Sequence, residues 1–241
     1  MSGHSHFHSI KHKKGRADEA RGKAFSKMAR LIAVAAREGS ADPESNSKLR
    51  LAVEKAKSIN MPKDNIERAI KKGSGETGGE QLEQITFEAY GPNKTAFIIE
   101  GITDNKNRTL GEIKKILNQY NGKLAQEGSV KWMFERKGTI VIDFKIQNQN
   151  LKKDELELLA IEAGADDIYW HNDFLDIYTK PEELENTKNK LEKKDIKIES
   201  STLDWVAKKT IEIPEKETCQ KLFEALDENE AVQDIYSNLK L

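Results

Sequence analysis

Basic side chains recur on one face of the segment that begins near Asp18, where they could bind phosphate groups. At 100° per residue they cluster within about 80° on a helical wheel, opposite an apolar stripe. The four residues are Lys23, Lys27, Arg30 and Arg37. No acidic residue follows the first three at i+4, so their charge is not neutralised within the helix. We therefore expect this basic stripe to project into solvent and contact a phosphate backbone; a solvated surface face is the alternative.

More lysines and arginines spread this basic character over residues 1–80. They are Lys11, Lys13, Lys14, Arg16, Arg21, Arg50, Lys55, Lys57, Lys63, Arg68, Lys71 and Lys72. Residues 1–72 hold 17 Lys+Arg against 8 Asp+Glu, a net charge of +9, whereas the remainder holds 23 against 33, a net of −10. This asymmetry indicates a basic module that meets a polyanion, carried on an acidic body. Such contacts carry no sequence information, and no zinc finger or clear helix-turn-helix is present.

A second polar and basic group lies in the connection 103–109, between an expected strand and an expected helix. Its candidate anion or partner contacts are Asn105, Lys106, Arg108 and Thr109. The N–H groups of a helix start could hold an anion there. The alternative, which the bare loop favours, is that its Asn and Asp side chains bond to the local backbone.

Other reactive residue types do not assemble into a catalytic or metal-binding motif. The histidines at positions 4, 6 and 8 alternate, but no nearby acidic or cysteine ligand completes a tetrahedral site. The acids around His171, namely Asp166, Asp167, Asp173 and Asp176, are expected to be solvated. Cys219 is expected to be a small core residue. We therefore expect no metal, no cofactor and no enzymatic activity; a metal-dependent enzyme is the weak alternative.

Three amphipathic helices must position the basic side chains. The first runs from Asp18 to about Glu38, and Asp42-Pro43-Glu44 signals the start of the second. Pro62 opens the third, which Gly73 ends. Residues 73–80 hold four glycines and no apolar side chain, so they are expected to form a hinge. This stretch lacks the spacing of a phosphate-binding glycine loop.

Beyond Gln81, strands alternate with helices in two similar rounds. The expected strands are 85–90, 96–102, 130–134, 139–144, 174–178, 202–213 and 232–236. The expected helices are 109–120, capped by Thr109 with Glu112, and then 153–163, 182–193 and 215–226. Short elements in this order indicate two small α+β sandwiches.

Composition places the chain among multi-domain proteins of the cytoplasm. Of its 241 residues, 34% are charged and 37% hydrophobic, which favours several small cores over one large core. No run approaches the ~18 apolar residues that a membrane span needs, and no secretory signal is visible. A lone cysteine excludes a disulfide framework and makes a reduced, cytoplasmic setting the expectation.

Several longer motifs resemble one known family. They are GHSHFHSIKHKKG, AFSKMARLIAVAAREG, NMPKDNIERAIKKGSG, FEAYGP, ITDNKNRT, GSVKWMFERKG and VQDIYSN. In this order they resemble the YebC family, which includes bacterial regulators and the mitochondrial translational activator of cytochrome c oxidase. The resemblance implies a multi-domain α and α+β fold, with a helical N-terminal domain followed by two small α+β sandwich domains. The third domain would be inserted in the second, giving residues 1–80, 81–134 with 204–241, and 135–203.

The resemblance also implies a non-enzymatic regulator of gene expression that binds nucleic acid. Some family members look like DNA-binding transcriptional regulators, and others act in translation as ribosome-associated factors that contact rRNA, tRNA or mRNA. The absence of a groove-reading motif leans towards RNA or non-specific contact. The chain departs from the family pattern at His6 and Phe7, where Lys and Trp are usual, and at Asn93-Lys94, where Gly-Gly is common.

Overall fold

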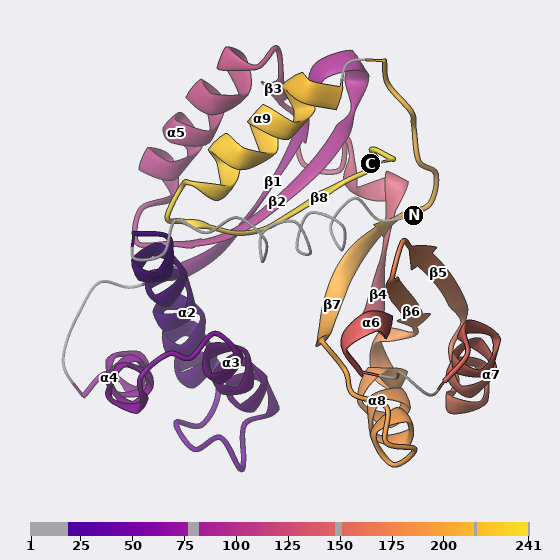
Figure 1. Ribbon diagram of the computed structural model, residues 1–241. Helices are drawn as coiled ribbons and strands as arrows, with labels where there is room; N and C mark the ends of the chain where they lie inside the picture. The colour runs from indigo at the N-terminus through magenta and orange to yellow at the C-terminus, as the bar shows by residue number, and fades with distance from the viewer. Residues whose placement is uncertain (1–18, 77–81, 148–150, 215, 241) are drawn as a thin grey trace.

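The computed structural model describes residues 19–76, 82–147, 151–214 and 216–240 (Figure 1). Its first unit is helical and consists of α2 (Glu19–Glu38), α3 (Ser47–Ser58) and α4 (Lys63–Ser74). The central helix, α2, packs against both others. Ile32, Leu49 and Ile66, one from each helix, are buried together in its core. The helix expected from Asp18 to about Glu38 is thus confirmed over the described residues.

The second helix begins later than its start signal predicts. Asp42-Pro43-Glu44 lies in a turn, and Asn46 caps α3 instead. The side-chain oxygen of Asn46 accepts the N–H of Leu49, while its amide donates to the Ala35 carbonyl oxygen at 2.8 Å. Because this second bond reaches back to α2, tertiary contact decides which residue caps α3.

The first residues of the stretch expected to form a hinge belong to α4 instead. Gly73 lies inside α4 against α2, where an added Cβ would come within 2.2 Å of the Ala33 carbonyl oxygen. The helix ends at Gly75, whose φ of 85° is the left-handed conformation that commonly closes helices. Residues 77–80 of the predicted hinge lie outside the described residues.

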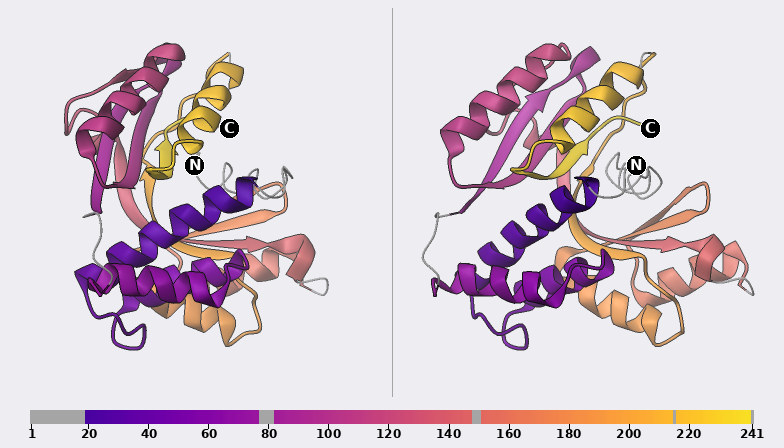
Figure 2. Two further views of the ribbon diagram at one scale, coloured as in Figure 1. Left: turned by 90° about the vertical axis from the view of Figure 1, so that its left-hand side faces the viewer. Right: turned by 60° about the vertical axis from the view of Figure 1, so that its left-hand side comes forward.

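An antiparallel sheet in the order β3-β1-β2-β8 forms the second unit. Its strands are β1 (Glu83–Tyr90), β2 (Ala96–Thr103), β3 (Lys123–Leu124) and β8 (Val232–Ser237). The helices α5 (Lys106–Gln119) and α9 (Lys216–Asp227) lie side by side over one face (Figure 2). Phe97 and Phe223, with ring centroids 5.1 Å apart, join sheet and helices in one core.

A second antiparallel sheet, in the order β5-β6-β4-β7, forms the third unit. Its strands are β4 (Phe134–Asp143), β5 (Asp167–His171), β6 (Phe174–Thr179) and β7 (Ser200–Ala207). The accompanying helices are α6 (Phe144–Gln147), α7 (Lys153–Ala163) and α8 (Leu184–Glu192). The described chain also contains three short 3-10 helices. They are η1 (Pro92–Lys94), which joins β1 to β2 in the second unit, η2 (Lys131–Met133) and η3 (Pro181–Glu183). Ile140, Leu156 and Ile177 lie at the centre of its core.

The order of the strands shows that the third unit is inserted in the second. The last strand, β8, pairs with β2, and all strands of the other sheet lie between them in the chain. The expected fold class is therefore confirmed. The numerical domain boundaries stay a proposal; the one at 203/204 falls inside β7, which pairs with β4 along its whole length.

Several sequence expectations in these units are wrong; for example, the strand expected over 202–213 ends at Ala207, the last residue of β7. Residues 131–133 form the turn η2 in place of a strand, and residues 167–171 form β5, which the acidic cluster there did not predict. Asp176 is fully buried, with its carboxylate 2.7 Å from Nε2 of His171, so it is not a solvated acid. For η2, β5 and Asp176, pairing with a distant strand or side chain overrides the local pattern.

Candidate nucleic-acid interface

Two members of the basic stripe of α2, Lys27 and Arg30, face the rest of the protein, which contradicts their expected exposure, whereas Arg37 is exposed as expected. Only 5% of Lys27 is exposed, and its Nζ donates to the Asp227 carbonyl oxygen (2.6 Å) and to Asp227 Oδ1 (3.0 Å). Arg30 donates to the Ile102 carbonyl oxygen (3.2 Å) and to Glu230 Oε2 (3.1 Å). The two acidic partners lie 200 residues away in the chain and Ile102 lies 72 residues away, so the i+4 rule could not reveal them.

The acidic connection between α9 and β8 thus neutralises part of the predicted interface. Asp227 and Glu230 belong to this connection, and Asp234 follows them in β8. The carboxylate of Asp234 lies 3.9 Å from Nζ of Lys55 on α3. These contacts dock the helical unit onto the acidic body. Lys27 and Lys55 therefore serve the docking of the two units first, and the predicted phosphate contacts must come from other cations.

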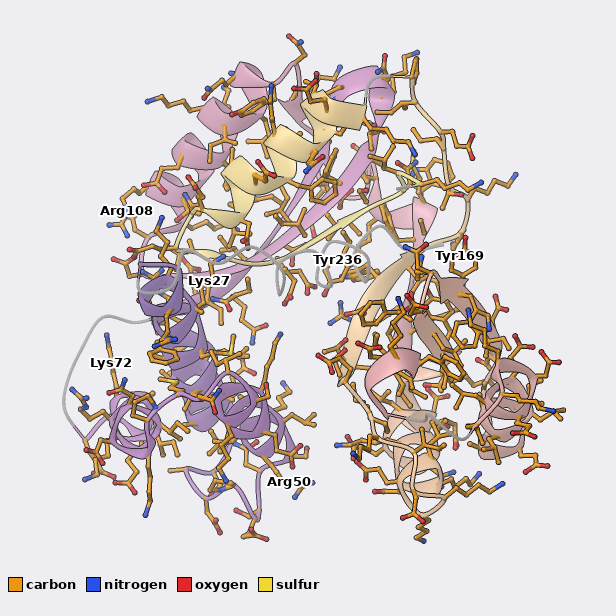
Figure 3. The ribbon with its side chains drawn as sticks, viewed as in Figure 1. Lys27, Arg50, Lys72, Arg108, Tyr169 and Tyr236 are labelled. Atoms are coloured by element: carbon orange, nitrogen blue, oxygen red, sulfur yellow. The ribbon has the colours of Figure 1, made fainter. Side chains whose placement is uncertain are left out.

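A groove of about 650 Å³ between α2, α4 and the start of α5 gathers several of those cations. Its basic lining consists of Arg68 and Lys72 on α4, Arg108 on α5, and Arg30 on α2, which also takes part in the docking contacts. In Figure 3, Lys72 and Arg108 lie on the same side of the molecule, although 36 residues separate them in the chain. The fold thus brings together cations from the two regions that the sequence marked separately.

The rest of the groove lining is mostly apolar. Phe25, Met61 and Leu82 line it from α2, the α3–α4 turn and the start of the first sheet. The sequence assigned Phe25 to the core face of α2. On the helical wheel it lies at the edge of that face, which is the one sequence feature indicating that it could also line a groove. A smaller hollow, of about 570 Å³, shares Leu82 and Asp104 with this groove and is lined by Arg37. Cationic and apolar lining together can hold both the phosphate and the less polar parts of a nucleotide.

Most polar groups of the β2–α5 connection form hydrogen bonds within the connection itself. Asn105 caps α5 by accepting the N–H of Arg108, so the helix begins three residues before the predicted cap, Thr109. Thr109 is buried, with its hydroxyl 2.8 Å from that of Thr103, so it cannot reach an anion and its expected role is wrong. The local-bonding alternative is therefore confirmed for Asn105, while Lys106 and Arg108 are exposed.

Asp104 sets the electrostatics of this end of the groove. Desolvation acts to raise the pKa of its carboxyl, but hydrogen bonds from its own backbone and from Arg108 outweigh it and lower the pKa. The carboxylate stays ionised and forms an ion pair with Arg108. An incoming phosphate would have to share Arg108 with Asp104, so the strongest attraction is expected towards α4.

The remaining predicted cations are spread around the helical unit. Arg21, Arg50, Lys57 and Lys71 are exposed, and Lys23 is half-buried. Figure 3 shows Arg50 at the end of the unit far from Arg108. Lys63 pairs with Glu67 at 3.5 Å. Lys11, Lys13, Lys14 and Arg16 lie outside the described residues. The fold therefore concentrates only part of the predicted set.

Two further features bear on function class. Within the described ranges, no three His, Cys, Asp or Glu side chains are grouped so that they could hold a metal ion. No described helix combines the length and apolar character needed to span a bilayer.

Comparison with known proteins agrees with this architecture. Residues 5–76 match the family model of the TACO1/YebC protein N-terminal domain, and residues 82–239 match that of the TACO1/YebC second and third domain. Proteins of Halothermothrix orenii and Persephonella marina, each named a probable transcriptional regulatory protein, are 44% identical to this chain; each alignment covers 100% of the chain and 96% of the relative. The crystal structure of a conserved hypothetical protein from Aquifex aeolicus is 43% identical, with a TM-score of 0.85 over 96% of this chain and 95% of that one. With both family models matched in order along almost its whole length, the chain belongs to the TACO1/YebC family.

Proposed function

We propose that this protein is a non-enzymatic regulator of gene expression that binds the phosphate backbone of DNA through its helical unit. The observation that carries the proposal is the groove in which Arg30, Arg68, Lys72 and Arg108 converge from three elements. The relatives named probable transcriptional regulatory proteins support a regulatory role. A cytoplasmic location and the absence of a cofactor belong to the same proposal.

The chemistry of the groove suits phosphate rather than base edges. Three of its four cations are arginines, whose planar guanidinium can donate two parallel hydrogen bonds to phosphate oxygens. Each neutralised phosphate releases condensed counterions, so affinity would fall steeply with salt and vary little with sequence.

A second candidate is a ribosome-associated translation factor that contacts structured RNA. The specific observation in its favour is that Lys27 and Arg30, on the basic face of α2, are already paired with Asp227 and Glu230. The groove cations therefore lie on three elements, and no single helix offers them for entry into a DNA major groove. Such an arrangement is better suited to the shape of folded RNA, which proteins recognise largely through its backbone.

The groove can be tested with the double variant Arg68→Gln/Lys72→Gln. Both side chains are exposed, so the protein should fold normally while its affinity for a DNA duplex falls and its salt dependence weakens by up to ~2 units of slope. Fluorescence anisotropy against duplexes of different sequence, from low to physiological salt, measures both quantities. Co-sedimentation with ribosomes at low salt, run beside it, separates the two candidates.

The matched control is Lys193→Gln/Lys197→Gln, which removes the same charge from exposed positions at and just beyond the end of α8. It should leave binding unchanged. A groove variant that keeps the affinity and the salt slope of the original protein would refute the proposed interface. If the original protein does not bind DNA, and the groove variant no longer associates with ribosomes, the second candidate is favoured.

A further inference from the structure

Trp132 is the most exposed of the large hydrophobic side chains that the structure describes, with 64% of its surface accessible. It lies in η2, at the start of β4, and does not line the basic groove. An exposed indole costs free energy in water, so the way in which the fold holds it is informative.

The loop that carries Trp132 is fixed by a buried carboxylate. Glu88 on β1 is 5% exposed and accepts the backbone N–H groups of Gly128 (2.6 Å), Val130 (2.5 Å) and Lys131 (2.9 Å). Burying a charge is costly unless several donors satisfy it, and here three backbone donors do so. The turn before Trp132 is therefore held in one conformation.

The ring itself is also anchored. Its Nε1–H donates to the Ser129 carbonyl oxygen at 2.9 Å, and Nζ of Lys208 donates to the Trp132 carbonyl oxygen at 3.0 Å. The N–H group of the indole is thus hydrogen-bonded within its own turn. What remains for a partner is the apolar face of a ring that loses little freedom on binding.

The surroundings of the ring favour an anionic partner. Lys131 precedes it in the chain, Lys208 contacts its backbone, and both lysines are exposed, whereas Val130 and Phe134 point into the core. Glu127 is exposed in the same loop, and Glu135 lies 3.8 Å from Lys137. Nζ of Lys131 lies 5.0 Å from the ring centroid of Trp205, so it is on the same part of the surface. A protein partner would need a wider apolar patch, whereas this loop offers a single exposed aromatic ring with lysines nearby.

We propose that Trp132 is a stacking platform for an unpaired base of a single-stranded nucleic acid, with Lys131 and Lys208 binding the flanking phosphates. Every base has a flat face that can stack on an indole, and nearby cations attract the adjoining backbone. The proposal rests on the proposed nucleic-acid function but concerns a separate site on the acidic body. It assigns unpaired segments to Trp132 and duplex phosphates to the groove.

The test uses the full chain, a labelled 12-nucleotide oligouridylate and a duplex of equal length. Trp132→Ala should weaken single-strand binding by roughly 5- to 100-fold and leave duplex binding unchanged. Trp132→Phe, which keeps an aromatic face, should retain most of the affinity. Leu158→Ala, which truncates another exposed apolar side chain (60% accessible, on α7), is the control and should change neither. Stacking should also quench tryptophan fluorescence in the original protein and not in Trp132→Phe.

The outcomes separate this site from the groove. If Trp132→Ala binds the oligouridylate as tightly as the original protein does, or the original protein does not bind it, the stacking platform is refuted, whatever the groove variant does. If Trp132→Ala loses only ribosome association and keeps single-strand affinity, Trp132 does not act by stacking on an unpaired base and the proposal is wrong. If single-strand binding depends on Trp132, the stacking platform is supported. If duplex affinity does not change in Arg68→Gln/Lys72→Gln, the groove is refuted independently.

Discussion

Lys27 and Glu88 are both charged side chains that the fold buries, and each is compensated in a different way. Lys27 has a carboxylate and a carbonyl oxygen of one distant residue, Asp227. Glu88 has three backbone donors of a neighbouring loop. In both cases the charge is retained because its partners replace the hydrogen bonds of water. Charged residues in this chain therefore serve local architecture as well as solubility.

Glu88→Gln should destabilise the protein at neutral pH but not in acid. Desolvation acts to raise the pKa of Glu88, but the three backbone hydrogen bonds and the charge of Lys131 outweigh it, so the folded pKa lies below 4.5. A lowered carboxyl pKa contributes stability above pH 4.5, and this contribution is lost as pH falls through the folded value. We expect the variant to lose about 1–3 kcal/mol at pH 7, because an amide N–H₂ cannot accept the backbone donors.

Urea denaturation at a series of pH values measures this difference. The gap between the original protein and the variant should narrow as the pH is lowered below the ordinary value of a glutamate. Equal stability of the two proteins at pH 7 would show that the loop does not depend on the carboxylate.

At the scale of elements, the close packing of α4 on α2 positions the groove. Gly73 allows it, since α4 passes directly over the Ala33 backbone. Arg68 and Lys72 lie on the same helix, so a shift of α4 would move half of the groove cations. The position of α4 therefore links a packing residue to binding.

Gly73→Ala should lower the free energy of unfolding by about 1–3 kcal/mol and weaken duplex binding. The new Cβ would lie 2.2 Å from the Ala33 carbonyl oxygen and 2.8 Å from its Cα, so the two helices must separate. The control is Gly111→Ala in α5, where no atom lies within 4 Å of the added Cβ. That change should stabilise the helix by about 0.5–1 kcal/mol. Equal effects of the two substitutions on unfolding would contradict the packing argument.

At the scale of the whole molecule, the basic and acidic parts of the chain meet in the folded protein. Lys27, Arg30 and Lys55 pair with Asp227, Glu230 and Asp234. A further pair, between Lys188 on α8 and Glu54 on α3, ties the helical unit to the inserted one at 3.6 Å. The charge asymmetry of the sequence thus has an intramolecular use beside the proposed intermolecular one.

Lys27→Gln/Arg30→Gln should loosen the helical unit from the body. The substitutions leave Asp227 and Glu230 without their cations at this interface, and salt of about 1 M, which screens exposed pairs, should enlarge the effect. Small-angle scattering should show a larger radius of gyration for Lys27→Gln/Arg30→Gln than for the original protein. The control Lys193→Gln/Lys197→Gln should show no such increase. An unchanged radius at both salt concentrations would mean that apolar contacts alone hold the units together.

The sequence alone determined the elements whose signals are local. Helical periods located α2, α4 and α7, and the period of strands located β1, β2, β6 and β8. The family motifs anticipated the inserted topology. These predictions succeed because side-chain spacing and turn residues act over a few positions.

The tertiary structure alone decided which of these residues could reach a partner. Lys27 and Thr109 looked exposed in the sequence and are buried, whereas Arg68 and Arg108, in separate motifs, share one groove. Trp132 belongs to an apolar pattern that predicted a strand, and the carboxylate of Glu88 holds it in an exposed turn instead. The physical reason is that ion pairs and buried hydrogen bonds depend on residues 40 to 200 positions apart, which no local periodicity records.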